Sequence, residues 1–146
     1  MPELHNPLDR ASLETRLRTL SPKAQPKWGR MTVDQMLWHL NQGLAINLGH
    51  FTVPMKKLPI PRALMRVVAL YLPWPKGVPT APEMQAKARH DFEAERQKCL
   101  ALIAETAQKP QDSTWGTHPA FGQMNGAQFS RLAALHLDHH LRQFGA

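Results

Sequence analysis

The chain has 146 residues, a formal net charge of +7 and one cysteine, Cys99. This length predicts one domain over residues 1–146, large enough to bury a core. A single cysteine excludes an internal disulfide framework and any zinc site built from several cysteines. No apolar stretch reaches the roughly 18 residues that a membrane span needs, and the first residues do not begin a signal peptide. We therefore expect a cytoplasmic protein without a membrane partner.

Segments with helical periodicity lie between clusters of proline. Their apolar residues recur at the spacing of one helix face, and no stretch shows the sustained alternation of a strand. The predicted helices cover about 9–20, 33–49, a short segment that opens at Pro61 and stops before Pro73, 81–107, and 126–144. The sequence therefore predicts an all-α fold of four longer helices and one short helix, the segment that opens at Pro61.

Three of these helices have a capping signal at their start. Thr32–Gln35, Thr80–Glu83 and Asn125–Gln128 each place a capping oxygen three residues before Gln or Glu. In this arrangement each side chain can bond a backbone N–H that the first turn leaves unpaired. Residues 28–36 and 121–129 also share one nine-residue pattern, which reads aromatic, Gly, x, Met, cap, x, x, Gln, apolar. This similarity indicates that the two loops lead into their helices with the same geometry.

Two histidines of the last predicted helix, His136 and His140, are four residues apart. This spacing places both imidazoles on one helix face. They continue its apolar stripe, and burying two unpaired imidazoles costs free energy, so a metal site is predicted. A catalytic zinc-type site usually takes three protein ligands, and His39 is the best third candidate because Gly43 leaves room one turn later. His39 alone could instead be a hydrogen-bonded histidine at the flank of its helix.

The other candidate residues have simpler interpretations. His139, at the helix flank, could be an outer group of the metal site, but is rather expected to be exposed. His118 is expected to be structural or solvated in a turn before proline. Cys99 lies on a core stripe and is expected to be a buried small apolar residue. Asp138 and Gln35 are candidates for orienting an imidazole from outside the metal site, although Gln35 is also expected to bond the cap of its own helix.

The basic charge is concentrated in one part of the chain. No acidic residue lies between Asp34 and Glu83, and this segment contains the cations Lys56, Lys57, Arg62, Arg66 and Lys76. The pattern is typical of a solvated basic face without a partner. It would equally suit contact with phosphate, a membrane surface or an anionic small molecule.

Two motifs carry a resemblance to a known family. Residues 31–39 read M-T-x-x-Q-M-L-x-H and residues 136–143 read H-x-x-H-H-x-x-Q. Over about residues 10–146 the chain resembles the DinB-like superfamily, and residues 76–83 and 117–122 resemble a subgroup without an assigned function. The resemblance implies a four-helix bundle, often dimeric, with a divalent metal bound by three histidines. Carried over position by position, these ligands are His39, His136 and His140.

The resemblance also leads to the main functional hypothesis. Some relatives use the metal to activate the thiol of a low-molecular-weight cofactor, which implies a metal-dependent thiol S-transferase, or a related hydrolase or isomerase. Arg62 and Arg66 would attract the anionic groups of such a cofactor. The alternatives are a non-catalytic metal-stabilised helical bundle and, on charge alone, a nucleic-acid-binding module. Three imidazoles suit zinc or nickel, and also iron or copper.

Overall fold

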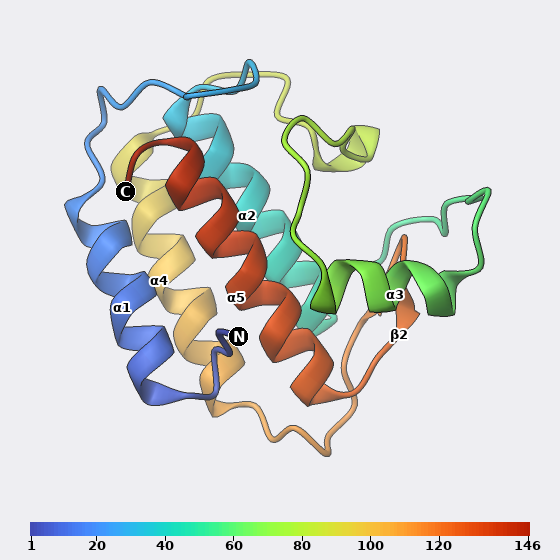
Figure 1. Cartoon of the computed structure of the whole chain (residues 1–146). Helices are drawn as coiled ribbons and strands as arrows, with labels where there is room; N and C mark the ends of the chain where they lie inside the picture. Colours follow the sequence, from blue (N-terminus) through green and yellow to red (C-terminus); the bar gives the residue numbers. More distant parts are fainter.

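Five α-helices and one turn of 3-10 helix make up most of the computed structural model, which describes residues 1–146 (Figure 1). The α-helices are α1 (Pro7–Thr19), α2 (Val33–Leu48), α3 (Arg62–Tyr71), α4 (Phe92–Gln108) and α5 (Gly126–Gln143). The remaining elements are η1 (Pro82–Met84) and the short strands β1 (Thr117–His118) and β2 (Gly122–Gln123). None of the helices combines the length and the apolar character needed to cross a bilayer. The all-α prediction is confirmed at this level.

The four longer helices lie alongside one another, and α3 lies to one side of them (Figure 1). Helix α2 packs against α4 and α5, and α1 packs against α5 and α4. Helix α3 contacts α5 and projects away from the other helices. The neighbouring positions of α2 and α5 matter for function because these two helices carry the histidines singled out above.

A single large cluster of apolar side chains fills the space between the helices. Its members recur three or four residues apart on each helix, which is the pattern of a buried helix face. The most deeply buried of them include Leu17, Leu37, Leu40, Cys99, Ile103, Phe129, Leu137 and Leu141. The apolar periodicity of the sequence therefore identified the inward face of each long helix.

The starts of α2 and α5 share the geometry that their similar sequences predict. Gly29 and Gly122, each three residues before the cap, have φ angles of +80° and +73°, which only glycine adopts without strain. The backbone N–H groups of Thr32 and Asn125 each donate over 3.1 Å to the glutamine three residues later. This part of the sequence prediction is confirmed.

The predicted helix over residues 81–107 is wrong in its first third. Only η1 forms at its start, residues 85–91 are not helical, and α4 begins after Asp91, whose side chain caps it. The backbone N–H of His90 donates to the buried carboxylate of Asp34 over 2.8 Å. That N–H cannot also serve a helical hydrogen bond, so a tertiary contact overrides the local helix signal.

Two smaller corrections concern the ends of elements. Pro61 is the cap of α3 and not its first helical residue, since the helix begins at Arg62. The prediction of no strands is also wrong, because β1 and β2 form an antiparallel pair in which His118 faces Gly122. Each strand has two residues, which is too short for any alternation to be visible in a sequence.

Candidate metal site

The structure brings three histidines from two helices into one cluster. His39 lies in the middle of α2, and His136 and His140 lie in the second half of α5. One ring nitrogen of each lies within 4.8 Å of the others. The ring centroids are 4.8 Å apart for His39 and His136, and 4.9 Å apart for each of the other two pairs. The predicted cluster is therefore present, and it could hold a metal ion.

The hydrogen bonds of His39 determine which of its nitrogens faces the cluster. Its Nδ1 lies 2.8 Å from the carbonyl oxygen of Met84, the last residue of η1. Since a carbonyl oxygen only accepts, Nδ1 must carry the proton. Nε2 of His39 then carries a lone pair, and this atom lies 2.8 Å from Nε2 of His136.

His140 is oriented in the same way by a side chain of its own helix. Its Nδ1 lies 2.7 Å from Oε1 of Gln143. The amide nitrogen of Gln143 donates to the backbone oxygen of Trp28 over 2.7 Å, which turns the amide oxygen toward the imidazole. His140 therefore donates through Nδ1, and its Nε2 is left as an acceptor.

His136 fits into the cluster because residue 43 is glycine. A Cβ atom on Gly43 would come within 3.2 Å of both Cε1 and Nδ1 of the His136 ring. The ring of Trp74, from the segment after α3, lies 5.8 Å from that of His136 and partly covers it. Glycine thus allows α2 and α5 to approach closely at the level of the site.

Burial keeps the cluster uncharged at neutral pH. Loss of solvation lowers the pKa of His39, lowers that of His136 well below its usual value, and lowers the pKa of His140 to about 3. The nearby histidines lower these pKa values further. Metal ligands must be neutral imidazoles, so the site is prepared to bind a cation without first releasing protons.

The set of donors suits a divalent transition metal. It offers three imidazole nitrogens, and the hydrogen bonds to Met84 and Gln143 are of the kind that orient metal-binding histidines in known sites. No carboxylate belongs to the cluster. Asp138, the nearest candidate from the sequence, is paired with Arg16 and Arg142 at 2.7 and 2.8 Å.

The outer residues of the site were predicted less well. Asp138 and Gln35 do not orient an imidazole, since Gln35 bonds Thr32 and the carbonyl of Ala88. Their place is taken by a backbone carbonyl, which has no signature in a sequence, and by Gln143. The H-x-x-H-H-x-x-Q spacing could have identified Gln143, because it lies one helical turn after His140.

Two other histidines have defined structural environments. His139 is half-buried and not exposed as expected, since the rings of Trp28 and Trp74 each lie 5.6 Å from its own. His118 has a structural role, which is one of the two roles predicted for it. Its Nδ1 accepts from the backbone N–H groups of Ala120 and Phe121 and so closes the turn between β1 and β2.

The basic segment and the cysteine do not contribute to the cluster. Arg62 donates to the carbonyl oxygens of Pro119 and Ala120, and Arg66 to that of Gln123. These hydrogen bonds hold α3 against the hairpin. Cys99 is completely buried, as predicted, and burial raises the pKa of its thiol to about 12.

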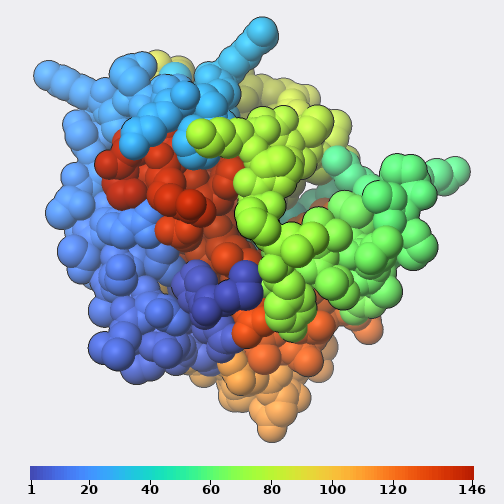
Figure 2. Space-filling view, in the orientation of Figure 1, coloured from blue at the N-terminus to red at the C-terminus, as the bar shows by residue number.

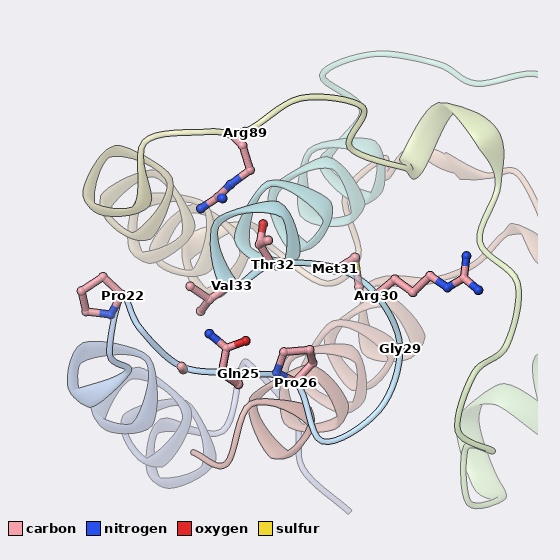
Figure 3. A pocket seen from close by; sticks show the side chains of 10 residues that line it. Pro22, Gln25, Pro26, Gly29, Arg30, Met31, Thr32, Val33 and Arg89 are labelled. Atoms are coloured by element: carbon pink, nitrogen blue, oxygen red, sulfur yellow. The ribbon is translucent and has the colours of Figure 1, made fainter.

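A pocket of about 210 Å³ lies at the start of α2 (Figure 3). The loop between α1 and α2 forms most of its wall, from Pro22 to Val33, and Arg89 lies on the opposite side. None of the three histidines lines it. The guanidinium of Arg89 is paired with the buried Asp34 at 2.9 Å, so this pocket offers no free cation from that side chain.

The fold and the site together define a helical protein with a buried three-histidine cluster that could hold a metal ion. The chain belongs to the family described as "Protein of unknown function (DUF1569)", which it matches over residues 5–146. No curated protein matches the chain, and no solved structure does.

Proposed function

We propose that this protein is a divalent-metal protein of the DinB-like type, in which His39, His136 and His140 are the metal ligands. The observation that carries the proposal is the convergence of three imidazoles, two of them held with Nδ1 protonated and Nε2 unprotonated. One ring nitrogen of each histidine lies within 4.8 Å of the others, and Nε2 of His39 is 2.8 Å from Nε2 of His136, so a single ion could contact all three rings.

The packing of the four longer helices supports a four-helix bundle with α3 as the additional short helix. The ligands come from α2 and α5, on motifs that resemble those of the DinB-like superfamily. Three protein ligands would leave one coordination position for water or substrate, as in catalytic sites. We regard zinc or nickel as the first candidates, because both accept imidazole nitrogen, as do iron and copper.

The activity that this site would support is a metal-dependent transfer of a low-molecular-weight thiol, or a related hydrolysis or isomerisation. A divalent ion at this position would lower the pKa of a bound thiol or water. The protein's own contribution is to keep the three ligands neutral, to orient His39 and His140 through their Nδ1 hydrogen bonds, and to place Trp74 beside His136. Cys99 would take no part, because it is buried and protonated.

Elemental analysis of untagged protein tests the metal site. We expect about one equivalent of metal per chain, lost in His39→Ala and in His140→Ala. His50→Ala is the matched control, because His50 pairs with Glu105 at the surface, outside the cluster. Absence of metal from the purified protein, with no uptake of added zinc or nickel, would refute the proposal.

A second measurement separates an enzyme from a metal-stabilised bundle without activity. Cobalt can replace zinc in such sites, and its visible absorption depends on the ligands. If the fourth position is open, adding a small thiol should change the spectrum of the cobalt protein. An unchanged spectrum, together with strong thermal stabilisation by the metal, would favour the non-catalytic alternative, in which the ion only links α2 to α5.

A further inference from the structure

The outer face of α3 is apolar and largely exposed. The side chains on this face are Ile60, Leu64, Val67, Val68, Tyr71 and Leu72, which we call the α3 face. Each is between 38% and 53% exposed. Leu64, Val67, Val68 and Tyr71 recur three or four residues apart on one side of α3, and Ile60 and Leu72 lie at its two ends. Helix α3 is the element that projects from the others (Figure 1).

Exposed apolar side chains are concentrated around this helix. Of the eleven large apolar residues that are exposed in the protein, nine lie between residues 51 and 78. This segment forms a protruding lobe beside the helical body (Figure 2). Single exposed apolar residues are ordinary, but a contiguous group of them marks an interaction surface.

The same segment carries positive charge that nothing in the chain neutralises. It has no acidic residue and contains five cations, Lys56, Lys57, Arg62, Arg66 and Lys76. None of the five takes part in an ion pair within 4.0 Å. Arg62 and Arg66 donate only to backbone carbonyls, and these uncharged acceptors leave the full charge in place.

We propose that the α3 face docks onto an anionic lipid surface, with its apolar side chains inserted among the headgroups. An exposed apolar helix face in a segment with five cations and no carboxylate suits this partner on both counts, apolar burial and charge. A second copy of the chain would bring the same acid-free, positively charged segment to this face, and like charges repel. Charge complementarity therefore selects the anionic surface as the occupant.

Vesicle co-sedimentation tests this docking. The protein should bind phosphatidylcholine vesicles containing about 30 mol % phosphatidylglycerol, bind pure phosphatidylcholine weakly, and lose affinity as salt is raised. The double variant Leu64→Ser, Val67→Ser should weaken binding by about tenfold or more. Lys57→Glu should weaken it by about fivefold or more, since each cation near such a surface contributes about that factor.

Two substitutions elsewhere serve as controls. Leu8→Ser removes an exposed apolar side chain on α1, and Lys98→Glu reverses an exposed charge on α4. Both should leave vesicle binding unchanged, and chelation of metal should not affect it. Equal binding to neutral and anionic vesicles, or no effect of the α3 variants, would overturn the proposal. A dimer in lipid-free solution that the Leu64→Ser, Val67→Ser variant dissociates would also overturn it, because a second copy would then cover the face.

Discussion

The Nε2 atoms of His39 and His136 lie 2.8 Å apart, although the residues are separated by 97 positions in the chain. The proton of His39 is on Nδ1, where the carbonyl of Met84 accepts it. The Nε2 lone pair of His39 therefore faces Nε2 of His136. Two bare nitrogens at this distance repel, so the contact requires either a proton on Nε2 of His136 or a cation shared by the two rings.

This relationship makes Gly43 a sensitive position. In Gly43→Ala the new Cβ would lie 3.2 Å from the His136 ring, which must then move by a few tenths of an ångström. We expect metal affinity to fall by about tenfold, the lower end of the range for changes next to metal ligands. Stability of the metal-free protein should change little, because alanine favours a helix by about 1 kcal/mol and offsets the tighter packing.

Metal titration and urea unfolding of the same variant check this prediction. A loss of stability without a loss of metal affinity would show that the His136 ring does not need its present position. Unchanged values of both would show that the ring adjusts freely.

Gln143 is expected to support the site through His140. In Gln143→Leu the Nδ1–H of His140 loses its acceptor, and the backbone oxygen of Trp28 loses its donor. Metal affinity should fall by about 10- to 100-fold. The metal-free protein should lose about 1–3 kcal/mol of stability, because buried polar groups are left unpaired.

Gln143→Glu is the matched comparison, since a carboxylate still accepts from His140 but no longer donates to Trp28. It should retain most of the metal affinity that Gln143→Leu loses. Competition with a chromophoric chelator measures both variants. Equal losses in the two would show that the bond to Trp28, and not the orientation of His140, is the important one.

Stability of the metal-free protein should fall as the pH is lowered from about 7.5 to about 5. Unfolded histidine binds a proton near pH 6.5, whereas burial lowers the pKa of folded His140 to about 3. Within this window the unfolded chain binds more protons, so acid favours unfolding. His140 alone should account for about 2 kcal/mol at pH 5, and His39 and His136 act in the same direction.

Urea unfolding at the two pH values measures this effect. The paired carboxylate of Asp34 also has a lowered pKa, but its contribution is lost only below its usual value of 3.8 and lies outside the window. Equal stability at both pH values would mean that the histidines are protonated in the folded protein without penalty.

Cys99 should be unreactive until the protein unfolds. Its thiol is completely buried, and its pKa is raised to about 12, so the thiolate fraction at pH 8 is roughly a thousandfold lower than for a free thiol. A disulfide reagent should label the native protein far more slowly than protein in urea. Rapid labelling of native protein would contradict this prediction, because it would show that the Cys99 thiol is accessible to solvent.

Much of the fold was predictable because it rests on local signals. Apolar periodicity and caps located α1, α2, α3 and α5 to within a few residues, and the helical spacing of His136 and His140 predicted that they share a face. His39 was predicted from its place in α2 and from the likeness to the DinB-like motifs. These features depend on residues close in the chain, so one sequence is enough to reveal them.

The tertiary structure decided what depends on contacts between distant residues. The buried carboxylate of Asp34 binds the backbone of His90 and delays the start of α4, which no local pattern shows. The carbonyl of Met84 orients His39 across 45 positions, and every residue type carries such a carbonyl. Residue identity thus determined which groups can act as ligands, and packing determined which of their nitrogens face one another.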